Sequence, residues 1–162
     1  MTQAQWDELT SNNPNWDVIL IGDGSGLKAA EPCGYACAIY EKYADGAIKQ
    51  DMVYGGSSHG TNNNAELMAY VSAMNFLMAR KAEEGRKQQY ATVVIVTDSE
   101  YVVKNGGKAN LLPRWLLDRM SAFGYRFVKQ HAKRCVFEEN VVADKLSRKA
   151  RLAMTQKKKE KN

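Results

Sequence analysis

Four acidic residues stand where carboxylates could act together on a phosphate ester. Asp23 and Asp98 each follow an apolar run, "DVILIG" and "ATVVIV", while Glu66 and Asp144 lie in segments with helical patterning. Oxygen ligands of this kind suit hard divalent cations such as Mg²⁺. Two such ions roughly 4 Å apart clamp the attacking and leaving oxygens in phosphoryl transfer. Should the fold bring the acids together, they predict metal-assisted phosphoryl transfer.

The two acids that follow strands also have ordinary structural explanations. Asp23 precedes Gly24, and Asp-Gly is a strong hairpin-turn signal because Asp bonds its own backbone and Gly accepts a positive φ. Asp98 could cap the helix that follows, with Ser99 competing for the same position.

The two acids in helices have alternatives as well. Asn63 followed by Glu66 resembles a capping box, and an acid in the first turn suits the helix dipole. However, Glu66 shares a helical face with Tyr70, and a carboxylate on an apolar face is unusual without a partner. Asp144 could pair with Arg148 one turn later.

The elements that would position these acids form an α/β domain with a mixed sheet. Strands are expected at 17–22, 34–43, 48–56, 91–98 and 125–131, and helices at 64–84, 100–104, 114–123 and 139–154, with loop at 105–113. Residues 1–15 are predicted to be an N-terminal extension of a short amphipathic turn and a linker, and residues 155–162 a basic disordered tail. Ligands of α/β sheets bind at the carboxyl ends of the strands, where Asp23 and Asp98 are expected.

Charge is distributed unevenly along the 162 residues. Residues 145–162 carry a net charge of +7, and the remaining residues carry −2. A basic end on a neutral-to-acidic body suggests a polyanionic partner held by that end. A solvated tail that aids solubility is the alternative.

The composition also limits the class of protein. The apolar runs are too short to cross a bilayer, and the polar, acid-containing start of the chain argues against a secretory signal, so we expect a cytoplasmic protein. The odd count of three cysteines argues for reduced thiols. Cys33 and Cys37 lie in a predicted strand about 13 Å apart, too far for two ligands of one zinc ion.

The ordered set of motifs "DGS", "TNNNAELMA", "VTDSEYV", "KQHA" and "NVVADKLS" resembles type 1 ribonuclease H over roughly residues 16–153. A ribonuclease H-like domain is accordingly expected at 16–154. The resemblance implies a five-stranded mixed sheet flanked by helices. It also implies endonucleolytic hydrolysis of the RNA strand of RNA–DNA hybrids with Mg²⁺ or Mn²⁺, leaving 5′-phosphate and 3′-hydroxyl ends.

The resemblance also implies roles for individual residues. The metal ligands and catalytic acids would be Asp23, Glu66, Asp98 and Asp144. His131 would be the mobile histidine that assists product release or proton transfer, although an exposed loop histidine is the alternative. Substrate contacts would come from Gly24, Ser25, Gly26, Thr61, Asn62, Asn63 and Glu100.

Three features depart from the family pattern. Ala29 stands where the family has an Asn that helps to read the RNA strand, and Glu100 stands where a Gln is common. The stretch "KNGGKANLLPRW" is short and only mildly basic where many members carry a basic, Trp-rich protrusion. The basic C-terminal end is a candidate substitute for that protrusion.

Two other functions remain open at this point. A structure-selective DNA nuclease of the same superfamily, such as a junction resolvase, would share the carboxylates. A non-catalytic nucleic-acid-binding domain has less reason to retain all four. A proofreading exonuclease fits worse, because it usually has Asp-x-Glu in the first strand and here Gly24 and Ser25 follow Asp23.

Overall fold

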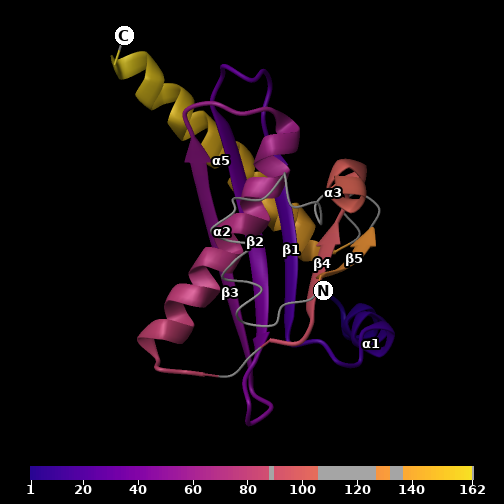
Figure 1. The fold of residues 1–162 in the computed structure, drawn as a ribbon. Coiled ribbons are helices and arrows are strands. Elements are labelled where there is room, and N and C mark those ends of the chain that lie inside the picture. Colours follow the sequence, from indigo (N-terminus) through magenta and orange to yellow (C-terminus); the bar gives the residue numbers. More distant parts are fainter. Residues whose placement is uncertain (88–89, 106–126, 132–136, 162) are drawn as a thin grey trace.

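A five-stranded mixed sheet forms the centre of the molecule, as the sequence predicted (Figure 1). The computed structural model describes residues 1–87, 90–105, 127–131 and 137–161. The strands are β1 (Val18–Ser25), β2 (Cys33–Lys42), β3 (Ile48–Ser57), β4 (Val93–Thr97) and β5 (Phe127–His131), and the helices are α1 (Gln3–Asn12), α2 (Asn62–Glu83), α3 (Glu100–Asn105) and α5 (Glu138–Lys161). The helix expected at 114–123, most of the loop expected at 105–113, and Cys135 lie outside the described residues.

The strand order β3-β2-β1-β4-β5 places β1 at the centre of the sheet. β1, β2 and β3 are antiparallel neighbours, whereas β1, β4 and β5 run parallel. The β2–β3 hairpin turns at Gly46, which has a φ of +87°, as the Asp45-Gly46 pair predicted. The two central parallel strands β1 and β4 are almost wholly buried, which explains their continuous apolar runs.

Helices cover both faces of the sheet. The apolar side of α2, including Tyr70 and Leu77, packs with Leu20 and Ile95 on one face. Leu9 of α1 and Phe137, just before α5, pack with Ile19 and Val94 on the other face. Because successive side chains of a strand point to opposite faces, the sheet separates two hydrophobic cores.

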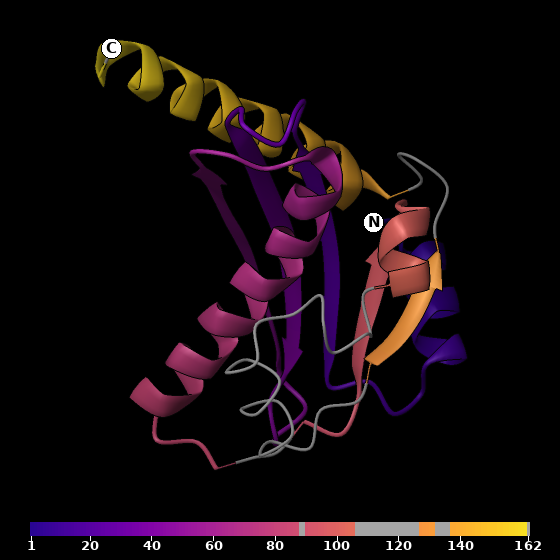
Figure 2. The same cartoon turned by 45° about the horizontal axis from the view of Figure 1, so that its top comes forward.

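α5 crosses the second face at very short range. A Cβ atom on Gly34 of β2 would lie 2.0 Å from the carbonyl oxygen of Ser147 and 2.5 Å from the backbone nitrogen of Arg151. Only glycine allows this approach, because any side chain would meet helix backbone. Figure 2 shows α5 crossing the sheet and extending past the edge strand β3.

Both ends of the chain differ from expectation. Residues 155–161 continue α5 and are not disordered, because Lys, Gln and Glu favour helix and the terminal lysines suit the negative end of the helix dipole. Near the start, Trp6 of α1 contacts the rings of Trp16 and Tyr40, with ring centroids 5.4 and 5.0 Å away. Residues 3–12 therefore pack as a helix on the domain. The domain boundaries at 15/16 and 154/155 stay a prediction.

Candidate active site

Asp23 lies within β1 and not in a turn. The strand continues to Ser25, and its pairing with β2 extends from Val18 opposite Glu41 to Ser25 opposite Gly34. The turn explanation is therefore wrong, because the chain leaves the sheet only after Ser25. The side chain of Asp23 is buried, with 8% exposed, and its Oδ1 accepts a hydrogen bond from the backbone N–H of Gly24 at 3.0 Å.

Glu66 is not needed to cap α2. Thr61 is the N-cap, and its hydroxyl accepts a bond from the backbone N–H of Asn64 at 3.1 Å. Asn64 Oδ1 accepts from the backbone N–H of Thr61 at 3.0 Å, which completes the box. The capping explanation through Asn63 is therefore wrong, and Glu66, one turn into the helix, points toward the sheet.

A glycine sets how closely α2 approaches β1 at this point. A Cβ atom on Gly24 would lie 2.3 Å from the backbone nitrogen of Glu66 and 2.8 Å from the Cβ of Ala65. Such distances exclude any other residue at position 24 without displacing the helix. Gly24 thus brings the carboxylate of Glu66 beside that of Asp23.

Asp98 follows β4 directly and comes one residue before the side chain that caps α3. The hydroxyl of Ser99 accepts a bond from the backbone N–H of Val102 at 3.3 Å and caps α3. Pairing between β1 and β4 ends at Ile21 opposite Val96. Beyond this pair the two strand ends carry Asp23 and Asp98.

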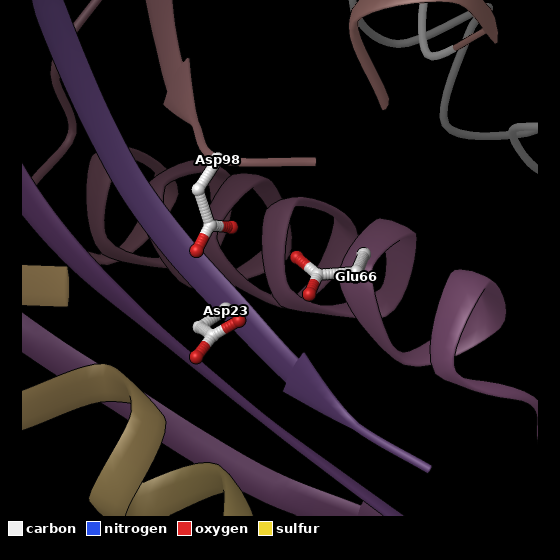
Figure 3. Close-up of side chains that lie close together, drawn as sticks. All are labelled: Asp23, Glu66 and Asp98. Atoms are coloured by element: carbon white, nitrogen blue, oxygen red, sulfur yellow. The ribbon is translucent and has the colours of Figure 1, made fainter. Parts of the chain in front are cut away.

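Carboxylate oxygens of Asp23, Glu66 and Asp98 all lie within 4.8 Å of one another. These three residues are called the acidic cluster below. Figure 3 shows the three side chains converging from β1, α2 and the end of β4. The cluster therefore occupies the carboxyl ends of two parallel strands, the position where α/β sheets bind ligands.

Asp144 lines the same pocket from α5. The pocket has a volume of about 320 Å³ and is lined by Asp23, Gly24, Ser25, Asn62, Glu66, Asp98, Ser99, Asp144 and Arg148. Arg148 Nη2 lies 3.3 Å from Asp144 Oδ2, so the expected pair within α5 forms, at the rim of the pocket. Among the described lining residues, Arg148 is the only cation facing four carboxylates.

The electrostatics of the acidic cluster favour a bound cation. Burial, together with the neighbouring charges of Asp23 and Asp98, raises the pKa of Glu66 to about 10. Burial and the neighbouring Asp98 and Asp144 raise the pKa of Asp23 to about 6, against the opposing effect of a hydrogen bond with Glu66. The Oε2 atom of Glu66 is buried and has no hydrogen-bond partner within the described part of the chain. Oxygen ligands with a deficit of positive charge fit a hard divalent ion.

Comparison with known proteins identifies the family. The family model described as RNase H matches residues 15–122, which is more than half of the chain. The chain belongs to the RNase H family. The matched range contains the whole acidic cluster, whereas His131 and Asp144 lie beyond it.

Curated ribonucleases H and solved RNase H structures resemble the chain. Ribonuclease H of Roseobacter denitrificans is 33% identical over 90 residues, and this match covers 56% of this chain and 53% of the relative. The chain thus spans about half the length of the curated relatives it matches. The N-terminal RNase H domain of a Mycobacterium tuberculosis protein, solved as a maltose-binding-protein fusion, aligns with a TM-score of 0.59 and 20% identity over 88% of this chain and 98% of that chain. RNase H1 of Halobacterium salinarum aligns with a TM-score of 0.56 and 22% identity over 83% of this chain and 96% of that chain. These structural matches show the shared fold.

Within the RNase H domain, Tyr70 ties the elements of the acidic cluster together. This buried side chain lies one turn after Glu66 on α2, and its hydroxyl donates to the carbonyl oxygen of Val96 at 2.9 Å. The same oxygen lies 3.3 Å from the backbone nitrogen of Gly22, from which it accepts a hydrogen bond. One hydroxyl therefore fixes α2 to both β1 and β4, just behind the acids.

The predicted substrate-contact residues divide into two groups. Gly24, Ser25 and Asn62 line the pocket, and Asn62 Oδ1 accepts a bond from the backbone N–H of Gly26 at 3.3 Å. In contrast, Asn63 is exposed outside the lining, and the Thr61 hydroxyl serves as the helix cap.

Two further predicted residues flank the site. Glu100 is the exposed first residue of α3 and does not belong to the acidic cluster. His131 is the last residue of β5, where its backbone pairs with Thr97, the residue before Asp98. Its strand position places His131 one strand away from the acids, and its side chain lies outside the described residues.

Sequence reasoning missed two residues beside the pocket. Ser99 was considered only as a cap, although it also lines the pocket. Arg151 was counted only as part of the basic end, yet its Nε donates to the hydroxyl of Ser25 at 2.9 Å. The spacing of Arg148 and Arg151 on the helix that carries Asp144 was the available signal, because residues three apart share a helix face.

Among the described helices, none combines the length and the apolar character that crossing a membrane requires.

Proposed function

We propose that this chain hydrolyses the RNA strand of RNA–DNA hybrids endonucleolytically and leaves 5′-phosphate and 3′-hydroxyl ends. The observation that carries the proposal is the acidic cluster at the carboxyl ends of β1 and β4 in a chain of the RNase H family. The names of the curated relatives support it, as does the solved complex of LC11-RNase H1 with an RNA/DNA hybrid, which aligns with a TM-score of 0.56 over 85% of this chain at 20% identity.

We propose Mg²⁺, or alternatively Mn²⁺, as the cofactor. Asp23, Glu66 and Asp98 would hold the ions, and Asp144 would be the fourth ligand once it separates from Arg148. A pair of bound ions supplies an acidified water for attack and neutralises the leaving 3′-oxygen, so no protein nucleophile is required.

The chain's own residues would position the substrate. Asn62 fixes the turn after β1 through Gly26, and Arg151 fixes the hydroxyl of Ser25. Backbone groups of residues 24–26, at the mouth of the pocket, are therefore held for contacts with phosphates and with the 2′-hydroxyls, which distinguish RNA from DNA. A side chain of ordinary size at position 24 would push α2 and Glu66 away from Asp23.

A cleavage panel tests this function. The protein is incubated with labelled RNA–DNA hybrid, duplex RNA, duplex DNA and a four-way DNA junction, first with Mg²⁺ and then with EDTA. We expect cleavage of the RNA strand of the hybrid in Mg²⁺, and no cleavage of it in EDTA. Asp98→Asn should retain fold and hybrid binding but lose cleavage by at least about a thousandfold, because an amide is a poor ligand for divalent ions. Asp7→Asn, an exposed substitution on α1, is the matched control and should cleave like the wild type.

Each alternative has its own outcome in this panel. Junction cleavage without hybrid cleavage would favour a DNA nuclease of the same superfamily. Hybrid binding without cleavage of any substrate in Mg²⁺ would favour a non-catalytic binding domain. Wild-type turnover by Asp98→Asn would contradict the assignment of the acidic cluster.

A further inference from the structure

α5 continues beyond the carboxylate pocket as a basic surface. Arg148 lines the pocket, and Arg151, Lys158 and Lys159 follow it at positions 3, 10 and 11 residues further along. At 100° per residue these four side chains point to one side of the helix. With a rise of 1.5 Å per residue, this surface leads about 16 Å away from the acids.

The loop between β1 and β2 forms the opposite wall of a groove. The groove has a volume of about 410 Å³ and is lined by Leu27, Glu31, Pro32, Arg151, Leu152, Thr155, Lys158 and Lys159, and it is called the α5 groove below. Its two leucines are unusually exposed, Leu27 by 65% and Leu152 by 59%. The groove thus combines an apolar surface with three cations and one acid.

Hydrogen bonds hold the two walls of the groove in place. Arg151 Nε donates to the hydroxyl of Ser25 at 2.9 Å, and Lys158 Nζ donates to the carbonyl oxygen of Ala30 at 2.9 Å. The close contact of α5 with Gly34 fixes the helix on the sheet nearby. Because Ser25 lines the carboxylate pocket as well, the α5 groove and the acidic cluster keep one relative position.

The chemistry of the α5 groove matches a sugar–phosphate backbone. Phosphates seek the cations of Arg151, Lys158 and Lys159, and the apolar faces of the sugars can cover Leu27 and Leu152. Charge complementarity acts over the whole segment, since residues 145–162 carry +7 and the rest of the chain −2. The groove begins beside a site that acts on phosphodiesters under the proposed function.

We propose that the α5 groove binds the sugar–phosphate backbone of the hybrid next to the bond that is cut. The proposal rests on the proposed function for the identity of the substrate. It gives the basic end of the chain a defined position on the substrate, in place of the solvated tail that was the alternative.

The test compares two double variants that lose the same charge. Lys158→Gln/Lys159→Gln removes two groove cations, and Lys149→Gln/Lys157→Gln removes two exposed lysines of α5 that do not line the groove. Hybrid affinity is measured by fluorescence anisotropy in the Asp98→Asn background over a series of salt concentrations. The groove variant should bind about tenfold more weakly near 0.1 M salt, and its slope of log K against log salt should become shallower by about 2. The control should keep the parent slope.

Two results would overturn the proposal: an unchanged slope in the groove variant, or equal changes in both double variants. The binding readout separates this proposal from the proposed function. Loss of hybrid cleavage with a groove-specific change in slope would reject the enzymatic function and keep the α5 groove. Hybrid cleavage with no groove-specific change in slope would support the enzymatic function and reject the α5 groove as a binding site.

Discussion

Two buried groups of carboxylates lie at opposite ends of the same sheet, and α2 contributes to both. The acidic cluster lies near the N-terminal end of α2 and the C-terminal end of β1. The second group surrounds Glu41 of β2, which is opposite Val18 at the start of β1. Glu41 is fully buried, yet cations from the chain surround it. In contrast, the pocket of the acidic cluster is lined by four carboxylates, the three of the cluster and Asp144, with Arg148 at its rim.

Glu41 is compensated on both oxygens. Arg80 Nη2 lies 2.5 Å from Oε1, Arg86 Nη1 lies 2.7 Å from Oε2, and the hydroxyl of Tyr90 also donates to Oε2. Arg80 further pairs with Asp51 of β3. These residues are called the Glu41 cluster below.

The pKa values of the two groups move in opposite directions. Burial would raise the pKa of Glu41, but bonds from Arg86, Tyr90 and Arg80 outweigh it and hold the pKa below its usual range. Burial and neighbouring acids raise the pKa of Glu66 and Asp23. A buried carboxylate that pairs with arginines of the chain serves the structure. Buried carboxylates that lie beside other acids fit an external cation.

The largest expected effect on stability comes from Glu41→Gln. This change removes the buried carboxylate that Arg80 and Arg86 share, although each keeps one other acid, and should cost about 3–5 kcal/mol in the free energy of unfolding. Urea denaturation followed by circular dichroism measures the loss. Glu83→Gln, an exposed change on α2, is the control and should alter stability by less than about 0.5 kcal/mol. A loss below 1 kcal/mol for Glu41→Gln would refute the structural role of the Glu41 cluster.

In EDTA, Glu66→Gln should raise the stability of the protein, whereas Glu41→Gln should lower it. Because the folded pKa of Glu66 is raised from 4.5 to about 10, the folded state holds a proton that the unfolded state releases. Wild-type stability should therefore fall as the pH rises between these values, and the Gln variant avoids this loss. We expect the variant to be more stable by about 1–3 kcal/mol at pH 8 and nearly equal to the wild type at pH 4.

Unfolding curves at several pH values in EDTA test this difference. Equal stability of the two proteins at pH 8, or a gap that widens toward acid, would show that Glu66 is compensated in the same way as Glu41.

A smaller effect is expected for Tyr70→Phe, which acts on how the acidic cluster is held. Loss of the hydroxyl leaves the backbone groups of Gly22 and Val96 without their side-chain partner and should cost about 1–2 kcal/mol. Mg²⁺ binding measured by calorimetry should weaken several-fold. Tyr43→Phe removes an exposed hydroxyl that donates to Glu84 and should change neither quantity appreciably. Stability loss with unchanged Mg²⁺ affinity would limit Tyr70 to packing.

Local signals predicted most of the fold and the membership of the acidic cluster. The long apolar runs located β1 and β4, and the Asp45-Gly46 pair located the β2–β3 turn. An acid at the end of each parallel strand was enough to predict that Asp23 and Asp98 meet, because parallel strands align their carboxyl ends.

Contacts between distant residues were not predictable from local signals. The bonds from Arg80 and Arg86 to Glu41 span 39 and 45 residues, and the Arg151–Ser25 bond spans 126. The cap of α2 was misassigned by two residues because Thr61 and Asn63 both suit an N-cap. Tertiary contact also decides that β1 continues through Asp23-Gly24, where the local signal favoured a turn. The cytoplasmic location stays a prediction.

Mg²⁺-dependent thermal stability tests the central difference between the two groups most directly. Melting curves are recorded for the wild type, Asp98→Asn and Glu41→Gln over a Mg²⁺ titration at constant ionic strength. We predict that Mg²⁺ stabilises the wild type and Glu41→Gln alike, by about 1.4 kcal/mol for each tenfold increase above the dissociation constant, and stabilises Asp98→Asn much less. Equal stabilisation of all three proteins, or none in the wild type, would contradict a cation site at Asp23, Glu66 and Asp98.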